Sequence, residues 1–220
     1  MAKVPLILYI SSATQLLPCV AWALSRPRTR AGAALAIGGV IGAVGDIVSR
    51  WMALRFGNNN LVTYIDAPLM TICFLAALRE WQLTARERRA FAVGSILFLL
   101  SCLGLVAFVE DINKLNFGVG PLGSLSLLAG GIWTLLRRTG AVERTPVLQT
   151  DWFWVASGLA LQGGATALAS PLGGFLLEHG RIDLFMIIWQ VRAIFVVTSY
   201  LLISWGIYRG HAVSKFETVG

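Results

Sequence analysis

Four ionisable residues, Asp46, Arg50, Asp66 and Arg192, lie inside segments that otherwise consist mainly of apolar residues. A charged side chain at the centre of a bilayer costs roughly 2.5–3.5 kcal/mol even on insertion-based scales, so such residues usually pair, face the protein interior and serve a function. Three of them belong to one stretch, GDIVSRWMALRFGNNNLVTYID at 45–66, which predicts two helices joined by a tight turn. This stretch and Arg192 are therefore the first candidates for a site.

The depth of each charge follows from the helical rise. At about 1.5 Å per residue, Asp46 and Arg192 lie roughly 10–12 Å below the outer boundary, and Arg50 and Asp66 roughly 5–8 Å below it. We expect Asp46 to pair with Arg192 and Arg50 with Asp66, while Asp46 and Arg50 are also one helical turn apart. Two interpretations remain open: a buried ion-pair network that fixes helix register, and a polar pocket that binds or moves a ligand.

Further polar residues surround these charges. The turn after Arg55 contains Gly57 and three asparagines, although one asparagine is enough to reverse the chain and cap the next helix. The two additional asparagines and Tyr64 lie close to Asp66 in the sequence. In the last apolar segment, Trp189 is too far from the segment end to be an interfacial anchor. The expected ligand-binding residues are Asp46, Arg50, Asn59, Tyr64, Asp66, Trp189, Gln190 and Arg192.

The composition indicates a membrane protein. Of 220 residues, 56% are hydrophobic and only 13% are charged, whereas about a quarter of the residues in soluble domains are charged. A membrane-spanning helix needs roughly 20 mainly apolar residues. We therefore predict an all-α polytopic protein, a single domain over 1–220 that forms a bundle of seven transmembrane helices. The expected segments are 4–24, 32–54, 61–80, 90–109, 118–136, 152–177 and 184–208.

The positive charges predict the orientation, because cytoplasmic loops retain Lys and Arg during insertion. One set of alternate loops and ends carries twelve of these residues, and the other carries four. This places the N-terminus outside and the C-terminus in the cytoplasm of a multi-pass cell-membrane protein, with the bacterial inner membrane as the expected location. The net charge of +7 is then a topology signal, and no nucleic-acid partner is expected. The loop REWQLTARERR at 79–89 is expected to be a solvated basic patch.

Small residues and helix breakers add two expectations about packing. Gly38, Gly42 and Gly45 are closely spaced on 32–54, which favours close helix contacts, either within the bundle or in a homodimer. Pro18 and Pro68 predict bends in the first and third segments. The sequences GVGPLG at 118–123 and SPLGG at 170–174 predict irregular helices near the outer side.

Several chemistries are disfavoured by what the apolar segments lack. Both histidines, His179 and His211, lie outside them, so no imidazole is placed for zinc or general-base chemistry. None of the three lysines lies within a segment, which excludes a retinal Schiff base. The three cysteines lie on separate segments without CxxC spacing. No metal or cofactor is expected, and a non-enzymatic role is favoured.

Two family resemblances follow from the residues already named. The stretch from Asp46 through Asn58 and Asn59 to Tyr64 resembles small uncharacterised bacterial seven-helix membrane proteins with an N-N turn before their third helix, a resemblance that implies no activity. The Gly45–Asp46 pair within a small-residue helix resembles the lysoplasmalogenase family of membrane hydrolases, which implies a functional role for intramembrane aspartates.

Three functions therefore remain open. We favour a charged pocket in the outer half of the bundle that binds or transports a small polar or amphipathic ligand. The alternatives are an accessory or structural subunit with a buried ion-pair network, and a lysoplasmalogenase-like intramembrane hydrolase. The expected partners are the lipid bilayer, a small-molecule ligand and a second copy docking through 32–54. Contact between Asp46 and Arg192, and a cavity that reaches them, distinguish a dry network from a pocket.

Overall fold

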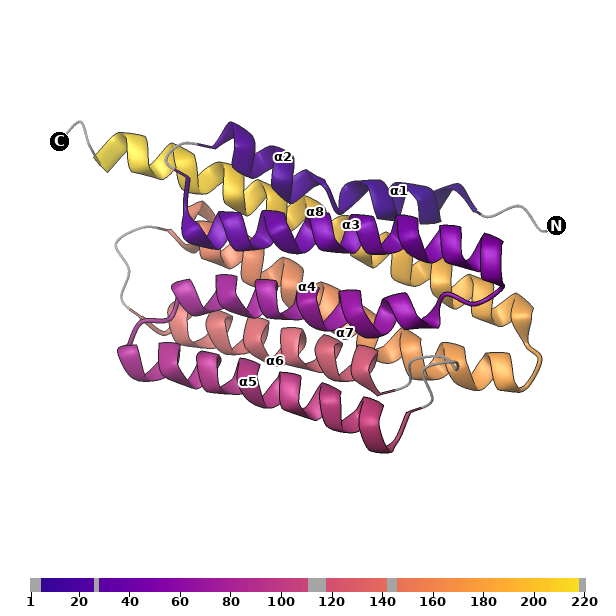
Figure 1. Ribbon diagram of the computed structural model, residues 1–220. Coiled ribbons are helices and arrows are strands. Elements are labelled where there is room, and N and C mark those ends of the chain that lie inside the picture. The colour runs from indigo at the N-terminus through magenta and orange to yellow at the C-terminus, as the bar shows by residue number, and fades with distance from the viewer. Residues whose placement is uncertain (1–4, 26–27, 111–117, 142–145, 218–220) are drawn as a thin grey trace.

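Long antiparallel helices form the whole of the described fold (Figure 1). The computed structural model describes residues 5–25, 28–110, 118–141 and 146–217, with side chains to residue 209, and no strand occurs in these ranges. The helices are α1 (Leu6–Thr14), α2 (Leu17–Leu24), α3 (Arg30–Phe56), α4 (Asn60–Glu80), α5 (Ala85–Phe108), α6 (Val119–Thr139), α7 (Asp151–Glu178) and α8 (Ile182–Glu217), with a 3₁₀ turn at Val147–Gln149.

Six segments in the described ranges are long and apolar enough to cross a membrane. They comprise α1 and α2 together, α3, α4, α5, α6, and residues 182–209 of α8. Helix α7 is equally long but contains several glycines and Gln162, and it packs between α6 and α8. The fold is that of an all-helical, multi-pass membrane protein.

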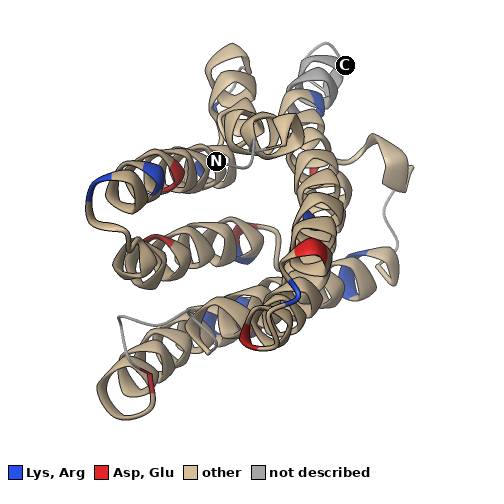
Figure 2. Ribbon diagram, turned by 90° about the vertical axis from the view of Figure 1, so that its right-hand side faces the viewer, with Lys and Arg blue, Asp and Glu red and all other residues tan. Residues whose placement is uncertain are grey.

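Six of the seven long segments form a closed ring. Each contacts the next in the order α1/α2, α3, α4, α6, α7, α8, and α8 returns to α1 and α2. Figure 2 views this arrangement from the end that carries the α3–α4 turn. Helix α5 lies outside the ring against α4 and α6 (Figure 1). Helices α4 and α8 consequently stand on opposite sides of the ring.

The first predicted segment is divided into two helices. Helix α1 ends at Thr14, and α2 begins at Leu17 with Pro18 in its first turn. Proline has no backbone N–H and fits best at a helix start. The structure therefore has a break between two helices where the sequence predicted a bend. The break turns the buried side chain of Gln15 toward α3, where it contacts Asp46.

The glycines of α3 allow its neighbours to approach closely. A Cβ atom on Gly38 would collide with the ring of Phe74 on α4, and one on Gly42 would collide with the Gln15 side chain. A Cβ atom on Gly45 would collide with the carboxylate of Asp66 on α4. The small residues therefore form packing surfaces inside the chain, which is the first of the two roles expected for them.

Three other predicted irregularities do not break their helices. Helix α4 continues through Pro68 and α7 continues through Pro171, while α6 is one continuous helix from Val119 onward. A proline removes one backbone donor, and a bundle tolerates this loss when neighbouring groups or small adjustments satisfy the freed carbonyl. These prolines and glycines therefore do not interrupt the helices that border the site.

A dry core fills the half of the bundle away from the α3–α4 turn. Its largest side chains come from α3, α4, α7 and α8 and have no exposed surface; they are Leu35, Phe74, Leu78, Leu159 and Ile203. Tyr200 joins this cluster from α8 and is 1% exposed. Apolar side chains thus fill the interior of the ring in this half of the bundle.

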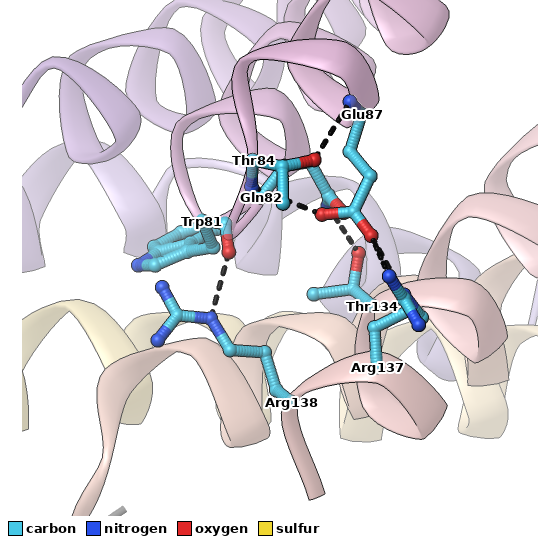
Figure 3. A network of polar contacts seen from close by, with 7 residues as sticks. All are labelled: Trp81, Gln82, Thr84, Glu87, Thr134, Arg137 and Arg138. Atoms are coloured by element: carbon cyan, nitrogen blue, oxygen red, sulfur yellow. Dashed lines mark hydrogen bonds and ion pairs between the residues drawn. The ribbon is translucent and has the colours of Figure 1, made fainter. Parts of the chain in front are cut away.

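The α4–α5 connection is not simply a solvated basic patch. Thr84 caps α5 through the backbone N–H of Glu87, and the Glu87 carboxylate accepts a hydrogen bond from the backbone N–H of Thr84 in return. The buried Glu87 side chain also forms an ion pair of 2.6 Å with Arg137 of α6 (Figure 3). This capping box starts α5 at Ala85 instead of the predicted residue 90.

A second set of contacts holds the same end of the bundle together. Arg138 Nε donates to the carbonyl of Trp81 at 2.7 Å, and the Gln82 amide donates to Thr134 Oγ1 at 2.9 Å (Figure 3). The Trp81 indole donates to Asp151 at the start of α7 at 3.2 Å. Polar contacts therefore join α4, α5, α6 and α7 at the end of the bundle that carries the α4–α5 connection.

Candidate functional site

A polar cavity of about 370 Å³ lies inside the ring, on the side of the α3–α4 turn. Helices α1, α3, α4, α6, α7 and α8 all contribute to its walls. Its charged lining residues are Asp46, Asp66 and Arg192, and Asn59 and Asn60 lie at the turn end. Pockets of this size commonly hold small molecules when a few polar groups converge on them.

Asp46 is held by α1 and not by Arg192. Its Oδ2 atom accepts hydrogen bonds from Ser12 Oγ at 2.5 Å and from Gln15 Nε2 at 2.8 Å. Both donors belong to the segment around the break between α1 and α2. The break therefore has a structural consequence, because it places the amide of Gln15 beside the hydroxyl of Ser12 at a carboxylate within the bundle.

Arg50 also turns toward α1, so its predicted pairing with Asp66 is wrong. Its Nη2 atom donates to Ser12 Oγ at 2.7 Å and to the carbonyl of Leu8 at 3.2 Å. Its guanidinium lies 4.5 Å from the centroid of the Tyr9 ring, a favourable cation–π distance. The Ser12 hydroxyl thus connects Arg50 to Asp46, and Arg50 lies behind the cavity wall.

Asp66 faces the cavity from α4 and rests against α3 at Gly45. The described side chains provide no hydrogen-bond donor or cation to its carboxylate; the backbone N–H of Ala67 is a donor within α4. Nearer the turn, Asn59 Nδ2 donates to Ser49 Oγ at 2.5 Å, which ties the start of α4 to α3. The Asp66 carboxylate therefore retains unused acceptor capacity in the cavity.

Arg192 faces the cavity from α8. Its Nε atom donates to Thr166 Oγ1 at 3.3 Å, and its guanidinium lies 4.8 Å from the centroid of the Trp189 ring. Trp189 is itself stacked on Phe185, with 5.0 Å between ring centroids. Among the described residues no carboxylate forms an ion pair with Arg192, so the predicted Asp46–Arg192 contact is also wrong. Several of its five N–H donors remain available to the cavity.

Gln162 and Tyr200 form the inner end of the cavity. The Gln162 amide donates to the Tyr200 hydroxyl at 3.5 Å, and that hydroxyl lies 3.6 Å from the sulfur of Met70. Gln162 is 6% exposed, and its Oε1 atom has no hydrogen-bond partner. A buried unsatisfied acceptor calls for an explanation, and a polar molecule in the cavity would supply one.

The structure brings five of the eight expected site residues to one cavity. They are Asp46, Asn59, Asp66, Trp189 and Arg192.

The other three expected residues lie elsewhere. Arg50 is behind the wall, Tyr64 is buried in an apolar cluster with Phe98 and Val119, and Gln190 is half-buried without lining the cavity.

Eleven polar lining residues were absent from the expected site, among them Gln15, Gln162, Thr166 and Tyr200. Isolated glutamines within apolar helices are a usable sequence signal, because burying an amide requires partners. Thr166 and Tyr200 carry no such signal, since both residues are common in helix packing. Their roles depend on which faces of α7 and α8 turn inward.

The arrangement suits binding through hydrogen bonds and charge. No group of three His, Cys, Asp or Glu residues that fits a metal ion occurs in the described part of the chain. Two carboxylates on one side and a guanidinium on the other offer opposite charges to one small molecule.

Comparisons with family models, curated proteins and solved structures find no match to this chain. Its own geometry defines the class, which is a multi-pass helical membrane protein with a polar cavity inside the bundle.

Proposed function

We propose that this protein binds a small polar ligand in the ring cavity, as a ligand-sensing or transport protein of the cell membrane. One observation carries the proposal: Asp46, Asp66 and Arg192 face the same cavity, and no ion pair joins them within the described residues. Charges that served only helix register would be neutralised by direct contact, because an uncompensated charge in a low-dielectric interior is costly. Water or a polar ligand in the cavity removes that cost.

The cavity faces the outside in this proposal. Nine arginines of the described chain lie at the helix ends away from it, namely Arg28, Arg30, Arg79, Arg86, Arg88, Arg89, Arg137, Arg138 and Arg209. At the helix ends on the cavity side, the described chain has two arginines, Arg55 and Arg181. The positive-inside rule favours a cytoplasmic location for the arginine-rich end. Ligand then enters beside the α3–α4 turn from the periplasm of a bacterial inner membrane, or its equivalent elsewhere.

A second candidate is an intramembrane hydrolase. It is favoured by the position of Asp66 against Gly45, which brings two carboxylates, Asp46 and Asp66, to adjacent places on the α3–α4 wall. Neighbouring carboxylates can share acid and base roles toward water. Hydrolysis of a lysoplasmalogen by the purified protein, abolished by Asp66→Asn, would support this candidate over simple binding.

The test of the proposed function is whether water reaches the cavity. In a chain whose native cysteines are replaced by alanine, Ser170→Cys places a thiol in the cavity wall. Leu168→Cys is the matched control, because Leu168 lies two residues away on α7 and is 76% exposed on the outer surface of the bundle. Methanethiosulfonates react with the thiolate, which forms in water and not in lipid.

We expect a membrane-impermeant methanethiosulfonate added outside to label Ser170→Cys and to leave Leu168→Cys unlabelled. Equal labelling of the two positions would show that the reagent does not report on the cavity. An unreactive Ser170→Cys in folded protein would contradict the proposal and favour the dry, structural interpretation of the buried charges.

A further inference from the structure

We propose that the cavity ligand is a zwitterion, with its cationic group at Asp66 and its anionic group at Arg192. This inference rests on the proposed function and specifies the class of ligand. It depends on the partners of each buried charge and on the positions of α4 and α8 in the ring.

The four intramembrane charges divide into a satisfied pair and an unsatisfied pair. Asp46 and Arg50 are joined through the hydroxyl of Ser12, which donates to the carboxylate and accepts from the guanidinium. Asp66 and Arg192 have no such link, since the described side chains give Asp66 no donor and give Arg192 only Thr166 Oγ1 and the Trp189 ring. The open functional groups of the cavity are therefore one anion and one cation.

The net charge selects the ligand class. Two acids and two bases sum to zero, so a ligand with a net charge would leave one unit uncompensated within the membrane, at considerable cost. A neutral molecule with separated charges satisfies both Asp66 and Arg192. The carboxylate is a strong acceptor for an ammonium group, and the guanidinium fork is suited to a carboxylate or phosphate.

The positions of the two residues impose a separation. Asp66 is on α4 and Arg192 is on α8, and these helices stand opposite each other in the ring. A ligand that contacts both must span the cavity, and its ammonium group or a water molecule beside it can donate to the unpaired Oε1 atom of Gln162. The distance between the ligand's charges is thus a specificity determinant.

The experiment measures the thermal midpoint of the detergent-purified protein against three matched series of small molecules. The zwitterions are glycine, β-alanine, γ-aminobutyrate and ε-aminocaproate; the others are n-alkylamines and n-alkyl carboxylates of the same lengths. Binding to the folded state raises the midpoint with concentration. We expect at least one zwitterion to bind about tenfold or more tightly than the amine and the carboxylate of its length, since each lacks one charge-assisted contact.

Two variants reverse the preference in opposite directions. Asp66→Asn is expected to bind the carboxylate at least as well as the zwitterion, and Arg192→Gln is expected to favour the amine. The controls are Asp183→Asn and Arg181→Gln, which alter an exposed ion pair of 3.6 Å at the α7–α8 turn. The controls should leave the order of the three series unchanged.

Each result has a defined meaning. Tighter binding of amines or carboxylates than of every zwitterion overturns the inference while leaving the binding function intact. Binding of no series also overturns it, and the labelling of Ser170→Cys then decides separately whether the cavity is accessible. If the cavity variants do not fold, the three series measured on the unaltered protein still decide the ligand class.

Discussion

Asp46 and Arg192 face one cavity from α3 and α8, yet each takes neutral hydrogen-bond partners and no ion pair joins them in the described structure. Ser12 and Gln15 donate to Asp46, and Thr166 accepts from Arg192. Neither charge therefore depends on the other for its hydrogen bonds, and only a longer-range attraction connects them. They can therefore be tested separately.

The first prediction concerns the strength of the coupling between these two charges. Asp46→Asn and Arg192→Gln should be only weakly coupled in their effects on unfolding, because the two side chains share no hydrogen bond or ion pair. A direct buried pair would instead lose about 3–5 kcal/mol on each single change, and the double change would recover much of that loss. Denaturation of the three variants in one detergent measures the coupling, and a large recovery in the double variant would restore the structural interpretation.

The second prediction uses the contact between Gly45 and Asp66. Gly45→Ala forces a methyl group against the Asp66 carboxylate and its Cβ atom, so that side chain must move. Overpacking of this kind typically costs about 1–3 kcal/mol. Ligand binding should weaken as well, because Asp66 is displaced from the cavity wall.

Gly94 provides the matched control for this change. An added Cβ atom at Gly94 of α5 meets nothing within 4 Å. Gly94→Ala should therefore be neutral or stabilise the helix by up to about 1 kcal/mol. Similar losses at both positions would show that the Gly45 effect does not arise from Asp66.

The third prediction concerns orientation. Single cysteines at Asn58, in the α3–α4 turn, and at Ala85, at the start of α5, lie at opposite ends of the bundle. An impermeant maleimide added to intact cells should label the first and reach the second only after the membrane is permeabilised. The opposite pattern would place the cavity on the cytoplasmic side, and the arginine-rich end outside.

Local features of the sequence predicted much of the fold. Helix positions follow from apolar runs, and the break before Pro18 follows from the missing N–H of proline. The earlier start of α5 was also readable, since Thr84-Ala85-Arg86-Glu87 matches a capping box. The seventh expected span, 152–177, is present as the long helix α7 of the bundle, but it is not among the six described segments that are apolar enough to cross a membrane.

The pairing of charges was not predictable in the same way. The helical rise predicts similar levels for Asp46 and Arg192, and both line one cavity, but the rise does not define how each helix is rotated about its axis. Arg50 illustrates the consequence, because it turns to α1 and Ser12 instead of Asp66. Rotation and ring order depend on tertiary packing, here on the glycine face of α3.

The dry layer beneath Tyr200 makes the cavity a blind chamber. Leu35, Phe74, Leu78 and Leu159 are fully buried side chains that fill the bundle between the cavity and the arginine-rich end. An ion or zwitterion crossing this layer would lose its hydration without compensation, a barrier of many kcal/mol. If the cavity holds a ligand as proposed, this conformation does not pass it on, and a transport cycle must include a second conformation in which the inner halves of α3, α4, α7 and α8 separate.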